Sequence, residues 1–143
     1  MKRFIIAAAA LAIGVSAVVA QADPIAERRN TMKAVGGATR DGAAMAKGEA
    51  PFDAAKAQGI FKIYADAAVK MPTLYPEGSR TGDTTAAPAI WEDPAGFRTA
   101  FAKFGEDAKA GAAASTDLAG FRTAFGAATR NCGSCHETYR VKR

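Results

Sequence analysis

The spacing of apolar residues near the C-terminus constrains the fold of this chain more than any other feature. From Phe121 to Tyr139, six small or apolar residues follow at intervals of four, three, four, three and four. This spacing marks one face of an α-helix that packs against other helices. Asp117 precedes it as an N-cap, so we expect a helix from there to about Tyr139 or Arg140. The six residues on its buried face are Phe121, Phe125, Ala128, Cys132, Cys135 and Tyr139.

Both cysteines on this face belong to the segment Cys132-Gly133-Ser134-Cys135-His136. A Cys-x-x-Cys-His segment is the attachment signature of a c-type haem. The two thiols add to the two vinyl groups of the haem, and the adjoining imidazole becomes an axial ligand of the iron. We therefore predict one covalent haem c per chain. Cys132 and Cys135 would bind it, and His136 would be the proximal iron ligand.

Three other interpretations of the same five residues fit less well. A thioredoxin-like dithiol is expected within a βαβ unit, and no βαβ pattern is present. A zinc site needs a fourth ligand, but the chain holds no further cysteine or histidine. A disulfide across two intervening residues would close a strained loop that stabilises little. The haem interpretation is favoured because the motif, the export signal and the helical pattern agree.

The first 22 residues resemble a secretory signal peptide. Lys2-Arg3 forms a basic start, an apolar run extends from Phe4 to Ala20, and Ala20-Gln21-Ala22 is an A-x-A cleavage site. A membrane anchor is the alternative. The run is short for a spanning helix, rich in alanine and followed at once by the processing site, which favours cleavage. We expect a periplasmic protein without a membrane anchor after processing.

Residues 23–143 are then a single cytochrome domain. Removal of Lys2 and Arg3 with the signal leaves 17 basic and 14 acidic residues, and two haem propionates would bring the charge near neutrality. The basic residues are dispersed, which argues against nucleic-acid binding. No nucleophile–base pair or metal cluster accompanies the haem motif, so we predict that the protein is not an enzyme.

Helical periodicity extends over most of residues 23–143. We expect further helices at about 24–47, 51–71 and 94–112, with an ordered crossover loop between Pro72 and Asp93. Connections that are short, long and short predict an all-α, up-down-up-down four-helix bundle with the haem in its core. The residues expected inside from the first and second helices are Ile25, Arg28, Met32, Val35, Thr39, Gly42 and Ala46, then Phe52, Ala55, Gly59 or Ile60, Ile63, Ala67 and Met71. From the third helix they are Phe97, Phe101, Phe104, Ala108 and Gly111 or Ala112, and from the loop Leu74, Tyr75, Ile90 and Trp91.

With the haem motif at the C-terminal end of such a bundle, the chain resembles the class II cytochromes c, the cytochrome c′ family. The segments that carry the resemblance are Lys47–Phe52, Leu74–Gly78, Ala89–Trp91 and Cys132–Arg140. They span essentially all of the processed chain. Class I cytochromes c have the haem motif near the N-terminus instead. The resemblance implies a bundle with haem in its core, and dimerisation is common in the family, although nothing here separates monomer from homodimer.

The ligand on the distal face of the iron is open to several side chains. His136 is the sole histidine and both cysteines are consumed, so methionine or an empty site remain, with lysine or tyrosine as weaker candidates. In an antiparallel pairing of the first and last helices, Met32 lies level with His136. Met45 is 13 residues further along, roughly 20 Å away at 1.5 Å per residue. Met71 lies at about the right level, but at a helix end beside Pro72.

The resemblance gives the distal position its functional meaning. Low-spin members of the family have methionine as iron ligand at the corresponding position of the first helix, whereas high-spin cytochromes c′ have an apolar or aromatic residue there. Met32 matches that position, four residues after Arg28. We therefore predict a carrier of single electrons with His136/Met32 ligation that serves unidentified redox partner proteins. In the alternative, Met32 is a core residue and a five-coordinate haem binds nitric oxide or another small gas.

Overall fold

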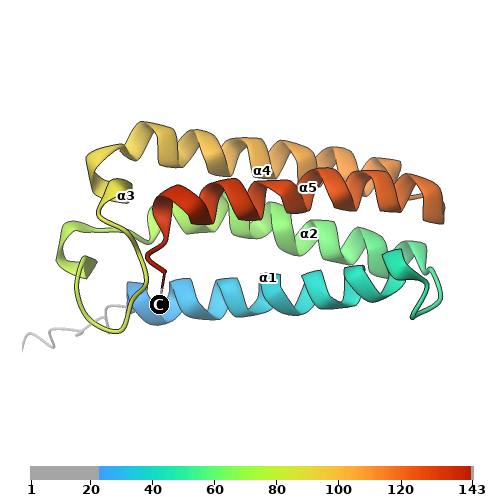
Figure 1. Ribbon diagram of the computed structural model, residues 1–143, viewed down its shortest axis with the longest axis horizontal. Coiled ribbons are helices and arrows are strands. Elements are labelled where there is room, and N and C mark those ends of the chain that lie inside the picture. The colour runs from blue at the N-terminus through green and yellow to red at the C-terminus, as the bar shows by residue number, and fades with distance from the viewer. Residues whose placement is uncertain (1–22, 143) are drawn as a thin grey trace, which may run out of the picture.

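The computed structural model describes residues 23–142, so the expected signal peptide at 1–22 lies outside the described residues. Four long helices form the bundle: α1 (Pro24–Lys47), α2 (Ala54–Lys70), α4 (Pro94–Ala114) and α5 (Leu118–Tyr139). Contacts join α1 to α2, α2 to α4, α4 to α5 and α5 to α1, which closes the ring of an up-down-up-down bundle (Figure 1). The predicted fold class is confirmed.

Each long helix begins at an aspartate whose side chain accepts a hydrogen bond from the first turn. Asp23, Asp53, Asp93 and Asp117 accept from backbone N–H groups two or three residues ahead. An N-cap of this kind satisfies one of the backbone donors that a helix start leaves without a partner. The Asp53 cap explains why α2 begins at Ala54 instead of near Pro51.

The first helix ends as its sequence predicts. Gly48 adopts φ +80°, and its N–H bonds to the carbonyl of Met45, which stops α1 after Lys47. A left-handed C-cap of this type favours glycine because a side chain there is strained. The two short turns after α1 and after α4 lie at the same end of the bundle, which we call the turn end (Figure 1).

The inward face of α2 differs from the predicted one. Ala55, Gly59 and Ile63 are exposed, whereas Ile60, Ala67 and Met71 are inside as expected. The prediction placed the aliphatic Ile63 inside and did not include its neighbour Tyr64, which is completely buried. Tyr64 can be buried because its hydroxyl forms a 2.8 Å hydrogen bond with Thr39 of α1. Thr39 in turn donates to the carbonyl of Val35.

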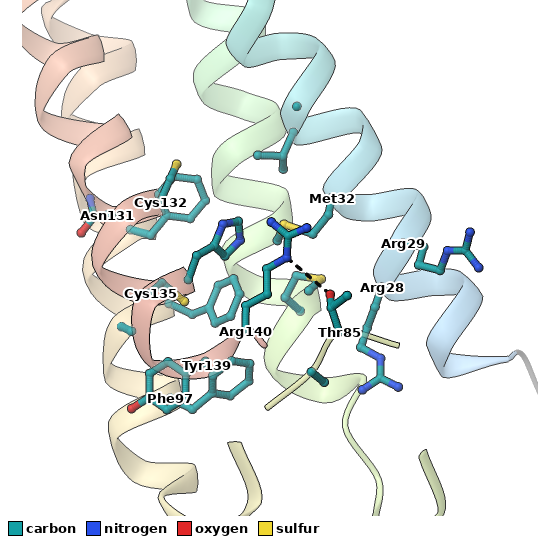
Figure 2. Close-up of a pocket in the computed structure, with 18 of the residues that line it drawn as sticks. Arg28, Arg29, Met32, Thr85, Phe97, Asn131, Cys132, Cys135, Tyr139 and Arg140 are labelled. Carbon is teal, nitrogen blue, oxygen red and sulfur yellow. Dashed lines mark hydrogen bonds between the residues drawn. The ribbon is translucent and has the colours of Figure 1, made fainter. Parts of the chain in front are cut away.

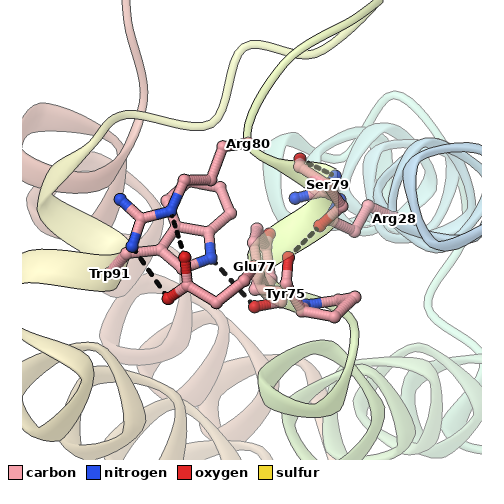
Figure 3. A network of polar contacts seen from close by, with 7 residues as sticks. Arg28, Tyr75, Glu77, Ser79, Arg80 and Trp91 are labelled. Atoms are coloured by element: carbon pink, nitrogen blue, oxygen red, sulfur yellow. Dashed lines mark hydrogen bonds and ion pairs between the residues drawn. The ribbon is translucent and has the colours of Figure 1, made fainter.

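The crossover between α2 and α4 is ordered, as expected, but it contains short helical turns that the sequence analysis did not resolve. These are η1 (Met71–Thr73), η2 (Glu77–Ser79) and α3 (Ala89–Glu92). Trp91 Nε1 donates to the carbonyl of Tyr75, and the two rings meet edge to face (Figure 3). Arg80 lies over Trp91 and holds Glu77 through two hydrogen bonds. The predicted anchoring of the loop is confirmed: Ile90 is buried, and Leu74, Tyr75 and Trp91 pack against the core.

Candidate functional site

A cavity of about 580 Å³ opens between α1, α5 and the crossover loop, at the end of the bundle opposite the two short turns. Its volume lies within the range of pockets that hold small molecules and cofactors. Aromatic residues of α4 form the apolar wall: Phe97, Phe101 and Phe104 are all buried.

The haem motif faces this cavity from α5. Cys132, Cys135 and His136 all line it, and both cysteines are half-buried free thiols. Burial raises the pKa of each thiol, whereas a redox-active dithiol needs a lowered one. Burial also lowers the pKa of His136, and the nearby Arg140 charge adds to this, so the imidazole is held in the neutral form that binds metals.

Met32 reaches the same cavity from α1. Figure 2 shows its side chain directed from α1 toward α5, where Cys132 and Cys135 lie. Met71 also lines the cavity, from the end of α2, and is more deeply buried. Met45 is buried in the core and does not line the cavity. The structure thus brings two of the three candidate methionines to the haem motif.

Arg28 is a buried cation in the wall of the cavity, and the sequence analysis gave it no role beyond an inward position. Only 5% of the residue is exposed. Its Nη2 donates to the carbonyl of Ser79 at 2.9 Å, and its guanidinium lies 4.4 Å from the centre of the Tyr75 ring (Figure 3). Its Nε and Nη1 have no hydrogen-bond partner among the described residues. A cation that lines the cavity therefore has two buried donors without a partner among the described residues.

Burial shifts the titration of both partners in this contact. It lowers the pKa of Arg28, against a smaller opposing effect of Tyr75, although an arginine stays charged even so. Burial raises the pKa of Tyr75 to about 12, so the phenol is neutral beside the guanidinium. The sequence signal that could have identified Arg28 is a charged residue within the mostly apolar inward face of the first helix.

The C-terminal tail is tied to the crossover loop along one side of the cavity. Ala87 N–H donates to the carbonyl of Tyr139, and Val141 N–H donates to the carbonyl of Thr85. Arg140 Nε lies 3.4 Å from Thr85 Oγ1, a contact visible in Figure 2. The loop residues Thr84, Thr85 and Ala86 line the cavity as a result. The sequence analysis identified none of these three.

Asn131 lies beside the motif and joins α5 to α4. Its side-chain amide donates to Asp107 at 2.8 Å and to the carbonyl of Ala128 at 3.1 Å. The pKa of Asp107 is lowered, mainly by its hydrogen bond with Lys103 and then by the bond from Asn131. Asp107 is half-buried and fixes the position of Asn131, the residue before Cys132.

A model of the family described as Cytochrome C′ matches residues 23–140. A cytochrome c′ of Rhodopseudomonas palustris is 42% identical over 92% of this chain and 90% of its own length. A solved structure of cytochrome c′ from that organism superimposes with a TM-score of 0.82 at 44% identity, over 86% of this chain and 99% of the other. A nitric oxide complex of a cytochrome c prime mutant from Alcaligenes xylosoxidans, 27% identical, covers 85% of this chain and 98% of the other with a TM-score of 0.74.

Within residues 23–142, no helix has the length and apolar character needed to cross a membrane. The four-helix bundle agrees with the fold of these matched structures. The chain belongs to the cytochrome c′ family, whose members carry one covalently attached haem c per chain.

Proposed function

We propose that this protein carries single electrons in the periplasm through its haem c. In this proposal Cys132 and Cys135 form the thioether bonds, His136 is the proximal iron ligand and Met32 the distal one. The observation that carries the proposal is the shared cavity: the thiols and the imidazole approach from α5, and the Met32 thioether approaches from α1.

The cavity fits the haem in chemistry as well as in position. Apolar rings of α4 suit the macrocycle, and the two thiols lie one helical turn apart on the face of α5 that lines the cavity. Arg28 offers two unpartnered donors there. A buried cation without an acceptor is costly, and a haem propionate is an anionic acceptor that would satisfy it. We infer that Arg28 pairs with one of the two propionates.

Bound haem c supplies a one-electron redox couple, whose potential is raised by a thioether ligand. The chain's own contribution is to place its ligands and to exclude water from them. Phe97, Phe101 and Phe104 form a dry wall, and the Met32 side chain is flexible enough to adjust to the iron. Met71 is a second thioether at the cavity and therefore the control for Met32. Nothing in the proposal requires substrate turnover.

A second candidate function is the binding of a small gas such as nitric oxide by a five-coordinate haem. The comparisons support this candidate better than the first, because the family model and the Rhodopseudomonas palustris relative described above are cytochromes c′ and one matched structure is a nitric oxide complex. The position of Met32 favours the first. In the second candidate Met32 is an apolar wall residue that leaves the distal face of the iron open.

Electron paramagnetic resonance and optical spectra of the oxidised holoprotein distinguish the two. Met32→Leu conserves volume, and Met71→Leu and Met45→Leu are matched controls. For the carrier we expect a low-spin ferric signal that only Met32→Leu converts to high-spin. A high-spin signal in the unaltered protein, or loss of the low-spin signal in Met71→Leu alone, contradicts Met32 ligation. A high-spin protein that forms a nitrosyl spectrum with nitric oxide is the gas binder.

Covalent attachment and export are tested separately. Haem staining on a denaturing gel after expression with a maturation system should be lost in Cys132→Ala/Cys135→Ala. A chain that retains no covalent haem in its unaltered form would overturn both candidate functions. Cell fractionation and the N-terminal residue of the mature protein test the expected periplasmic location and the cleavage after Ala22.

A further inference from the structure

Positive charge surrounds the opening of the cavity. Four cations line it, namely Arg28, Arg29, Lys33 and Arg140, and no aspartate or glutamate of the described residues does. Arg28 is buried, as described above, but the other three are exposed. The exposed cations therefore act on whatever approaches the opening from solvent.

Arg29 and Lys33 belong to a stripe of three exposed cations along α1, whose third member, Arg40, lies outside the lining of the cavity. Arg29, Lys33 and Arg40 are spaced by four and seven residues, which places them on one side of the helix over roughly 16 Å. Arg29 forms an ion pair with the exposed Asp83, which offsets part of its charge. Lys33 and Arg40 take part in none of the ion pairs found within residues 23–142.

Arg140 lines the opening from the α5 side, where the chain leaves that helix. The backbone hydrogen bond from Val141 N–H to the carbonyl of Thr85 holds this segment against the crossover loop, while Arg140 stays exposed. Lys142 follows two residues later and is also exposed. The five exposed cations, which we call the basic rim, are Arg29, Lys33, Arg40, Arg140 and Lys142.

We propose that the basic rim is the docking surface for an acidic protein that exchanges electrons with the haem. This inference rests on the proposed carrier function. The two propionates of the haem carry two negative charges. Arg28, which is not part of the rim, offsets one of them, so the five cations of the rim keep an excess of positive charge. Complementary charge around a cofactor opening raises the rate of encounter and orients the partner.

The composition of the rim favours a protein partner over a membrane surface. Helices that bind membranes combine cations with large apolar side chains that insert among the lipids. Of the large apolar residues that the described chain exposes, Ile63 and Val69 lie on α2, and only Val141 lies beside the rim. The α1 stripe has glycines, Gly36 and Gly37, between its cations, and these offer nothing to insert.

The test measures oxidation of the reduced holoprotein by two complexes of opposite charge, hexacyanoferrate(III) and tris(phenanthroline)cobalt(III), in a stopped-flow instrument. Lys33→Glu/Arg40→Glu reverses the stripe. Lys56→Glu/Lys109→Glu makes the same change in net charge on α2 and α4, away from the cavity. In about 10 mM salt we expect the stripe variant to react roughly three- to tenfold more slowly with the anion and faster with the cation. Both effects should vanish near 0.5 M salt, where screening is strong.

Poly-L-glutamate serves as a probe for an acidic surface. It should slow the reaction of the unaltered protein with hexacyanoferrate(III) in low salt and leave the stripe variant unaffected. Equal rate changes in the stripe and control variants would show a net-charge effect without a docking surface. Rate changes of the same sign with both oxidants would reflect an altered haem potential, and they too would overturn the inference.

Sedimentation with vesicles tests the membrane alternative. Binding to phosphatidylglycerol vesicles, absent with phosphatidylcholine and lost in the stripe variant, would replace the protein partner by an anionic membrane and overturn the proposal. A holoprotein that reacts with neither oxidant contradicts the carrier function itself. A holoprotein that reacts with both oxidants, without discrimination by charge, contradicts only the basic rim as a docking surface.

Discussion

The two ends of the bundle are built from the same helices but differ in how side chains fill the space between them. At the turn end, a glycine of one helix meets an aromatic ring of another: a Cβ on Gly42 would overlap Phe125, and one on Gly111 would overlap Phe61. At the other end the helix faces leave a cavity, lined by Phe97 and its neighbours. The turn end is therefore filled by the chain's own side chains, whereas the other end leaves space that a cofactor can fill.

The largest expected effect is at the turn end. Phe121 is completely buried and contacts Phe52, Phe61 and Phe125. Phe121→Ala should lower the free energy of unfolding by about 3–5 kcal/mol, because it leaves a void in a packed region. Urea denaturation of the holoprotein measures this. The exposed Val69→Ala should change the stability by less than about 0.5 kcal/mol. A loss below about 1 kcal/mol for Phe121→Ala would contradict tight packing at this end.

A polar pair, the buried Tyr64 and the half-buried Thr39, lies at the boundary between the two ends, and we expect it to affect the stability of the protein in alkaline solution. Burial raises the pKa of Tyr64 to about 12, although its hydrogen bond with Thr39 opposes the shift. A folded pKa above the unfolded value of 10 means that the stabilisation is fully present below pH 10 and lost as the pH rises through about 12. Two units correspond to at most about 2.7 kcal/mol.

Tyr64→Phe removes this titration. Its free energy of unfolding should therefore fall less than that of the unaltered protein between about pH 9 and pH 11.5, as measured by far-ultraviolet circular dichroism in urea. At neutral pH the substitution should cost about 1 kcal/mol, the contribution of a typical hydrogen bond. Identical alkaline profiles for the two proteins would indicate that Tyr64 is accessible to solvent.

Replacement of glycine by alanine should destabilise the protein at one site and stabilise it at another. Gly111→Ala forces the new methyl group against Phe61, and we expect a loss of about 1–3 kcal/mol from overpacking. Gly59 lies in the interior of α2 and has nothing within 4 Å of the place that a methyl group would take, so Gly59→Ala should gain about 0.5–1 kcal/mol from helix propensity. Thermal unfolding of the two holoprotein variants checks the signs. Stabilisation by both would mean that the helices approach less closely than the structure indicates.

The smallest effect concerns the link between α4 and α5 beside the haem motif. Hydrogen bonds from Lys103 and Asn131 lower the pKa of Asp107, so its stabilisation is present above the unfolded value and lost as the pH falls through the lower folded value. Because the carboxylate is partly exposed, we expect about 0.5 kcal/mol. Asp107→Asn should flatten the fall in stability between about pH 5 and pH 2.5, and Asn131→Ala should do so in part. An unchanged acid profile in both variants would contradict the interaction.

Most of the fold follows from spacing and capping residues, and the deviations have local causes. The aspartate caps and Gly48 mark helix boundaries to within a few residues, and α1 ends where predicted. The inward face of α2 was partly wrong because a buried hydroxyl depends on a partner in another helix, which periodicity does not reveal. The short turns of the crossover loop were missed for the same reason, since contacts such as that of Trp91 with Tyr75 hold them in place.

The candidate site also combines features that can be predicted from the sequence with features that depend on the tertiary structure. The spacing of Cys132, Cys135 and His136 is a property of the sequence, because the chemistry of attachment requires it within one helical turn. The level of Met32 relative to His136 could be derived from helix length and antiparallel packing. Arg28 could be placed inside, but its contacts with Ser79 and Tyr75, and the two donors that they leave without a partner, could not be predicted, because they depend on a distant loop.

Helical periodicity, caps and covalent chemistry are local properties of the chain, so the amino-acid sequence alone predicts a four-helix bundle with a haem motif on a buried face. The tertiary structure decided where the bundle is hollow, which methionines reach the hollow, and which cations surround its opening. These features depend on the volumes and charges of side chains from four helices and a loop together, so no single segment of the sequence reveals them.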